Sequence, residues 1–274
     1  MLDNDTQDKI CALVRTQPRT IQEIAHAIDR NWRTADAYVT RIERESGLIA
    51  TRTFRGGTKG ALKIAYWRPT PDAGTSVQQH MLERIAHGRR KEDFSPFDIY
   101  QFVEPSQRAA YMEMTEFSKH PDIKFDKLLL SASRQVIFFS GNLSWMELGP
   151  NARKAFEELA RRRVSLKVLT RVDITSEKNV REMLALNKRF GTDIVEIRHC
   201  EQPLRAIIVD DAFISMKEVL SPLAHRELRK KHFMFFIIRE HSWVVWLQQV
   251  FWHLWQQSID AQTRTEALAT LKRL

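Results

Sequence analysis

Residues 20–47 read TIQEIAHAIDRNWRTADAYVTRIERESG, and this stretch decides the fold of the N-terminal part of the chain. Thr20 is followed three residues later by Glu23, the pattern of a capping box, so we expect a helix to begin here. A three-residue turn, 29–31, leads into a longer helix over residues 32–46. Two helices joined by a short turn predict a helix-turn-helix.

Elements on either side complete this module. Residues 5–16 predict a short helix before it, and the capped helix covers residues 20–28. After it come two β-prone runs, IATRTFR (49–55) and ALKIAYWRP (61–69), separated by the sequence GGTKG. They predict a hairpin with a basic tip. Helix, helix, turn, helix and hairpin form the layout of a winged helix-turn-helix, which we assign to residues 1–70.

The charge of this module favours a nucleic-acid partner. The chain of 274 residues has a net charge of +9, and residues 30–68 carry seven arginines and two lysines against three acidic residues. The third helix has an apolar stripe, so its basic side chains point away from the core and towards double-stranded DNA. A basic module that binds a protein or packs internally is the alternative. The candidate DNA contacts are Arg30, Asn31, Trp32, Arg33, Thr34, Arg41, Arg44, Arg55, Lys59 and Lys63.

The rest of the chain predicts a connector and an α/β domain. Residues 71–127 are interpreted as a helical connector, with helices over 76–87 and 108–119. From residue 128 to residue 274, short runs rich in Val, Ile and Phe alternate with helical patterns, which indicates a sheet buried between helices. An apolar stripe from Trp243 to Trp255 predicts an amphipathic helix that packs on this sheet.

Residues 203–210, PLRAIIVD, are one of these predicted strands and have the spacing of a phosphodiesterase motif, His-x-Lys followed by Asp. Pro203 stands at the His position and Arg205 at the Lys position, while Asp210 is in place. Phosphodiester hydrolysis of this kind needs a histidine nucleophile and a second histidine as general acid. The chain contains no His-x-Lys, so we expect no enzyme activity; a displaced nucleophile at His199 is the alternative.

The winged helix, the connector and an α/β domain carrying FSGNLSW (139–145) and QPLRAIIVDD (202–211) resemble the archaeal TrmB-like transcriptional regulators. The C-terminal domain of that family is similar to the phospholipase D fold, so the resemblance implies a phospholipase D-like α/β sandwich. It covers most of the chain. It also implies a DNA-binding homodimer whose C-terminal domains associate and sense a small-molecule effector.

Five residues then belong to a degenerate phosphodiesterase motif or to a ligand pocket: Ser140, Asn142, Pro203, Arg205 and Asp210. Arg205 either holds an anionic ligand or pairs with Asp210 or Asp211. Ser140, Gly141 and Asn142 form either a ligand-binding turn or a tight turn that caps the next element.

The composition indicates what to expect of metals, cofactors and membrane contact. The two cysteines, Cys11 and Cys200, fit no metal or disulfide spacing, and we expect neither a metal nor a cofactor. The N-terminus is acidic and polar, and the apolar run 233–247 is interrupted by charged residues. We therefore expect a cytoplasmic protein that does not enter a membrane. A homodimeric transcriptional regulator is the leading hypothesis; an architectural chromatin-type protein and a phospholipase D-like nuclease are the alternatives.

Overall fold

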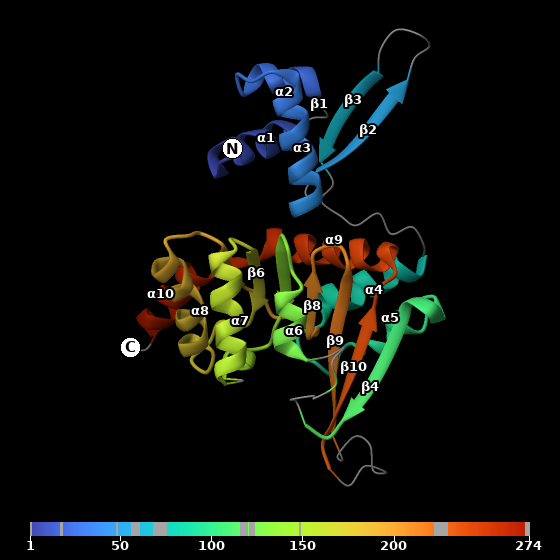
Figure 1. Cartoon of the computed structure of the whole chain (residues 1–274), viewed down its shortest axis with the longest axis vertical. Coiled ribbons are helices and arrows are strands. Elements are labelled where there is room, and N and C mark those ends of the chain that lie inside the picture. The colour runs from blue at the N-terminus through green and yellow to red at the C-terminus, as the bar shows by residue number, and fades with distance from the viewer. Residues whose placement is uncertain are drawn as a thin grey trace. The chain divides into compact units, whose positions relative to one another are not determined.

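The computed structural model (Figure 1) describes residues 2–16, 19–47, 49–55, 61–67, 76–115, 120, 124–147, 149–221 and 230–271. Contacts divide the chain into two compact units, Met1–Asp72 and Ala73–Leu274. The segment interpreted from sequence as a connector therefore belongs to the second unit.

The first unit contains three helices and three strands. They are α1 (Asn4–Thr16), β1 (Arg19–Thr20), α2 (Ile21–Ala27), α3 (Trp32–Ser46), β2 (Ile49–Arg55) and β3 (Ala61–Trp67). The strands form an antiparallel sheet in the order β1-β3-β2. The three predicted helices and the two hairpin strands are confirmed, whereas β1 has no counterpart in the sequence prediction.

Local signals account for the start and end of the two central helices. The capping box is present, because the Glu23 amide donates to the Thr20 hydroxyl at 3.1 Å and the Thr20 amide donates to the Glu23 carboxylate at 2.7 Å. Gly47 ends α3 in the left-handed conformation, with φ of 61°. All three helices contribute to one buried core: Ile10, Val14, Ile21, Ile24, Ala25, Ile28, Ala35, Val39, Ile42, Ile49 and Ala65.

The second unit is built on an eight-stranded mixed sheet in the order β11-β7-β6-β5-β8-β9-β10-β4. Only the β5–β6 and β6–β7 pairs are parallel. The strands are β4 (Arg108–Glu113), β5 (Gln135–Phe139), β6 (Ser165–Thr170), β7 (Val195–His199), β8 (Ala206–Val209), β9 (Phe213–Leu220), β10 (His232–Ile238) and β11 (Ile259–Asp260). The α/β class with a large sheet is thus confirmed.

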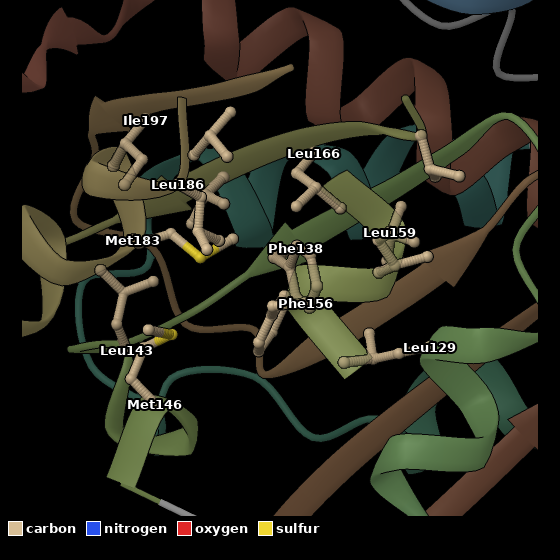
Figure 2. Packing of buried hydrophobic residues seen from close by; sticks show 14 of the residues in the cluster. Leu129, Phe138, Leu143, Met146, Phe156, Leu159, Leu166, Met183, Leu186 and Ile197 are labelled. Carbon is tan, nitrogen blue, oxygen red and sulfur yellow. The ribbon is translucent and has the colours of Figure 1, made fainter. Parts of the chain in front are cut away.

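Helices cover both faces of this sheet. On one face α6 (Phe125–Leu130), α7 (Pro150–Arg161) and α8 (Glu177–Phe190) share a core with the central strands. In Figure 2, Phe138 of β5 lies against Phe156 of α7, and Met183 of α8 extends the same cluster. On the other face lies α9 (His241–Gln257), whose Phe251 contacts Phe139 edge-to-face at 5.3 Å.

The remaining elements are α4 (Ser76–His87), α5 (Phe97–Tyr100), two short 3₁₀ helices, η1 (Pro105–Gln107) and η2 (Ser144–Glu147), and α10 (Ala261–Leu271). The helix predicted over 76–87 is confirmed. The sequence analysis missed α10 and β11. None of the described helices is both long and apolar enough to cross a bilayer.

The helix predicted over residues 108–119 is wrong where the structure describes it. Residues 108–113 form β4, which pairs antiparallel with β10 from Arg108↔Ile238 to Glu113↔Phe233. Ala, Met and Glu favour a helix locally, but the ladder and the packing of Ala109 and Tyr111 on β10 outweigh this propensity. The segment is the edge strand of the large sheet.

Candidate functional site

The exposed face of α3 presents arginines opposite its buried face. Ala35, Val39, Ile42 and Ser46 are buried against the core of the first unit. Arg33, Ala37 and Arg44 are exposed and follow each other at intervals of four and seven residues, so they share the opposite face of the helix. The described structure records no carboxylate partner for Arg33 or Arg44. This face can receive an anionic surface.

The acidic side chains of α3 are all engaged elsewhere. Asp36 binds the Lys63 ammonium at 2.6 Å, and Glu45 binds Nε of Arg41 at 2.9 Å. Glu43 accepts hydrogen bonds from the amide and the hydroxyl of Thr51, both at 2.8 Å. Asp36 and Glu45 are therefore paired with cations, and Glu43 is hydrogen-bonded, within the first unit.

The residues at the start of α3 have distinct roles. Asn31 is the N-cap, and its Oδ1 accepts the Thr34 amide hydrogen at 2.9 Å. Trp32 is 44% exposed although it is the largest side-chain type. Arg30 is exposed and its Nη1 donates only to the carbonyl of Asp29, at 3.0 Å. Trp32 and Arg30 thus extend the exposed face, whereas the amide oxygen of Asn31 holds the helix start.

The predicted hairpin contacts differ in what the structure describes. Lys63 donates to Asp36 and also to the Thr40 hydroxyl at 3.2 Å, so it fastens β3 to α3. The side chain of Arg55 and the whole of Lys59 lie outside the described residues.

In the second unit, three of the five predicted motif residues line one pocket. Ser140, Asn142 and Arg205 surround a cavity of about 460 Å³ on the face of the sheet that carries α6 and α7. The described lining includes neither Pro203 nor Asp210. The motif residues are therefore divided between a pocket and two packing sites.

The turn after β5 is both a tight turn and part of the pocket wall. The Ser140 hydroxyl oxygen accepts from the amide of Leu143 at 3.0 Å and from the indole of Trp145 at 3.2 Å. Asn142 Oδ1 accepts from the Ser144 amide at 3.2 Å. Leu143 is held at φ of 59°, an uncommon conformation for a non-glycine residue. The side-chain oxygens of Ser140 and Asn142 thus accept hydrogen bonds within the turn. The Ser140 hydroxyl proton and the Asn142 amide hydrogens have no recorded acceptor within the described structure.

Asp210 secures the opposite end of β8. Its carboxylate accepts hydrogen bonds at 2.9 Å from the amides of Ser133, Arg134 and Gln135 and from the Ser133 hydroxyl. Burial raises the pKa of this carboxyl, but the hydrogen bonds from residues 133–135 outweigh burial and leave the pKa below its ordinary value. Asp210 therefore ties β8 to the start of β5.

Pro203 packs against the loop that follows α4. A Cβ atom at Gly88 would lie 2.8 Å from Cγ of Pro203 and 3.0 Å from the carbonyl oxygen of Arg84. His199, the candidate displaced nucleophile, lies in β7, where its Nδ1 accepts the Val172 amide hydrogen at 2.9 Å. Burial lowers the pKa of His199, and Arg264 adds to this. None of the described residues that line the pocket is a histidine.

The predicted ion pair between Arg205 and Asp210 or Asp211 is wrong. Asp211 binds Arg134 at 2.5 Å, and Arg205 donates only to main-chain carbonyls, those of Leu204 at 2.6 Å and Gln202 at 3.4 Å. Burial lowers the pKa of Arg205, and Arg171 lowers it further. The short strand β8 separates Arg205 from Asp210, which explains why they do not meet.

The sequence analysis missed four lysines of the pocket, Lys91, Lys124, Lys217 and Lys231. Lys217 on β9 and Lys231 immediately before β10 alternate with other residues of the lining, so a period of two was the available signal. It was insufficient, because only the strand pairing reveals that they face the same cavity as Arg205.

Similarity to known proteins is found among solved structures. The sequence matches no protein-family model and no curated protein. Among solved structures, TrmBL2, an archaeal chromatin protein that binds DNA, is 16% identical with a TM-score of 0.41, over 94% of each chain. Two further solved structures resemble part of the chain. Nuc from Salmonella typhimurium, a phospholipase D family member, is 14% identical with a TM-score of 0.39, over 56% of this chain and 98% of its own. NucT from Helicobacter pylori is 8% identical with a TM-score of 0.41, over 56% of this chain and 99% of its own.

Proposed function

We propose that this protein is a double-stranded DNA-binding transcriptional regulator that acts as a homodimer. Its first unit serves as a winged helix-turn-helix, with α3 as the recognition helix in the major groove and the β2–β3 hairpin as the wing. The second unit associates the two copies and performs no phosphodiester chemistry.

One observation carries the DNA-binding proposal, namely that the exposed arginines Arg33 and Arg44 of α3 have no carboxylate partner recorded among the described residues. Arg33 and Arg44 keep their full charge available because the acids of the same helix are bound to Lys63, Arg41 and Thr51. The small side chain of Ala37 between them lets the helix approach the groove floor closely. Arginine forms bidentate hydrogen bonds with guanine or phosphate, so the face suits both base reading and positioning.

The inactive second unit is proposed from the pocket and from the position of His199. The described lining lacks the histidine nucleophile on which this type of phosphodiester hydrolysis depends. His199 uses Nδ1 to hold the Val172 amide in a different part of the sheet. Replacing His199 by Ala should therefore reveal no difference in phosphodiesterase assays, and activity that vanishes with this change would support the nuclease alternative.

The test is selection of duplexes by the purified full chain from a random DNA pool at about 0.15 M salt, where non-specific contacts are weakened. We expect enrichment of a short palindromic motif with half-sites about 10 base pairs apart, since a two-fold dimer places two recognition helices one turn apart. Sedimentation equilibrium with and without the selected duplex measures the dimer directly. Retention without enrichment would replace the regulator by an architectural protein, and a fragmented pool would indicate a nuclease.

A further inference from the structure

The pocket of the second unit is lined by several cations, and the proposed DNA binding gives these cations no role. Among its described lining residues, five carry a positive charge and one, Asp126, carries a negative charge. The cations come from five separate places in the fold: the loop after α4, the N-cap of α6, the residue before β8, strand β9 and the residue before β10. They are Lys91, Lys124, Arg205, Lys217 and Lys231.

Neighbouring acids hold Lys91 and Lys124 only loosely. Lys91 lies 3.7 Å from Glu92, and Lys124 lies 3.4 Å from Asp126, both at distances that belong to loose ion pairs. Lys231 lies over the ring of Phe233 at 4.9 Å. Arg205 makes its recorded hydrogen bonds through Nη1, so Nε and Nη2 have no recorded acceptor in the described structure.

Neutral donors are grouped beside Arg205. The guanidinium of Arg205 lies over Gly141, which is the residue between Ser140 and Asn142 in the turn after β5. The hydroxyl proton of Ser140 and the amide hydrogens of Asn142 have no recorded acceptor among the described residues. The first turn of α7 adds to them, since Asn151 and Ala152 line the same wall and the N-cap, Gly149, offers no side chain to its amides.

The opposite wall is apolar and aromatic. Phe125, Trp145 and Phe138 form one continuous aromatic group, with ring centroids 6.0 Å and 4.8 Å apart, and all three line the pocket. Phe233 and Phe235 on β10 close the other side. The cavity of about 460 Å³ thus has cations and hydrogen-bond donors on one side and apolar rings on the other. It accepts a molecule of metabolite or drug size that has a charged end and an apolar body.

We propose that this pocket binds an organic anion, with a phosphate or carboxylate group held by Arg205, Ser140 and Asn142 and an aromatic or aliphatic body against Phe125, Trp145 and Phe233. Binding of the anion neutralises the surplus of positive charge in the described lining. The inference does not require DNA binding, because every lining residue belongs to the second unit.

The test is isothermal titration calorimetry of the full chain, without DNA, using phenyl phosphate, benzoate and phenol as probes. We expect one phenyl phosphate or benzoate per chain with a dissociation constant below about 1 mM, and phenol at least about tenfold weaker. The preferred anion distinguishes a phosphomonoester from a carboxylate ligand. Phenol binding as well as both anions, or no saturable binding of either anion, overturns the proposal.

Variants locate the site and separate it from the DNA-binding face. Arg205→Met should weaken the preferred anion at least about tenfold, and Lys217→Met should weaken it about threefold or more. The matched controls Arg181→Met and Lys178→Met, on the exposed side of α8, should leave affinity unchanged. If Arg205→Met fails to fold by circular dichroism, Lys217→Met decides. Arg33→Ala should not alter probe binding; anion binding lost in Arg33→Ala but retained in Arg205→Met and Lys217→Met would overturn the pocket assignment.

Discussion

The guanidinium of Arg205 lies directly over the Cα atom of Gly141. A Cβ atom at position 141 would be 2.5 Å from Nη2 and 2.7 Å from Cζ of Arg205, closer than any real contact allows. Only glycine leaves room for the guanidinium of Arg205 in this position. The contact joins the turn after β5 to β8 and fixes the end of the arginine side chain in the pocket.

Gly141→Ala should displace the guanidinium of Arg205 and weaken anion binding about tenfold. The overlapping atoms are the end of a flexible side chain, so the backbone need not move, and the free energy of unfolding should change by less than about 1 kcal/mol. Calorimetric titration with the preferred anionic probe and urea unfolding measure the two effects. If Gly141 acts through Arg205, adding Gly141→Ala to Arg205→Met should cause no further loss. Additive losses would contradict this coupling.

Asp210→Asn should lower the free energy of unfolding by about 1.5–3 kcal/mol near neutral pH, because the charged acceptor of four hydrogen bonds is lost. The folded-state pKa of Asp210 is lowered, so its stabilisation is complete above the ordinary aspartate pKa of about 3.9 and disappears as the pH falls through the lower folded value. The difference between wild type and variant should thus shrink below about pH 4.

The control for this prediction is Asp211→Asn. Asp211 is exposed and bound to Arg134, so its replacement should cost less than about 1 kcal/mol. Urea unfolding of all three proteins across the acidic range gives the comparison. Equal losses for Asp210→Asn and Asp211→Asn would remove the role assigned to Asp210.

Arg33→Ala should weaken binding to the selected duplex by about 1–3 kcal/mol and relax the base preference at one position. Lys59→Ala should weaken binding by a similar amount on every sequence, because a lysine at the predicted hairpin tip contacts phosphate. Competition titrations against the selected and a scrambled duplex distinguish the two variants. An equal loss for Arg33→Ala on both duplexes would show that Arg33 does not read bases.

Lys63→Met should act on stability more than on DNA binding. Its ammonium is bound to Asp36 and Thr40 and is only partly exposed. We therefore expect the free energy of unfolding of the first unit to fall by about 0.5–1 kcal/mol. The salt dependence of DNA affinity should stay as in the wild type, because an engaged ammonium releases no counterion. A decrease of the salt slope by about 1 would instead identify Lys63 as a phosphate contact.

Local patterns were sufficient for most helices and for the buried face of α3. The Thr20–Glu23 capping box, the Asn31 cap and Gly47 act within three or four residues, so the sequence encodes them directly. The apolar period of α3 likewise predicted which side chains are buried. The two signals together located the exposed arginines.

Local patterns failed at the edge of the large sheet and in the pocket. The sequence of β4 favours a helix, and only its partner β10, more than one hundred residues away, makes it a strand. The pairing of Arg205 with an aspartate was predicted from proximity in sequence, whereas β8 holds the two side chains at opposite ends.

The sequence alone was enough to predict the helices of the first unit and the basic face of α3, and to place proline at position 203, where the phosphodiesterase motif has histidine. The tertiary structure alone revealed the separation of Asp210 from Arg205 and the meeting of five cations in one pocket. The physical reason is the distance along the sequence over which each kind of signal acts. Caps, periodicity and residue chemistry act over a few neighbours, while a pocket wall is assembled by strand order and helix packing, which no short stretch of the chain encodes.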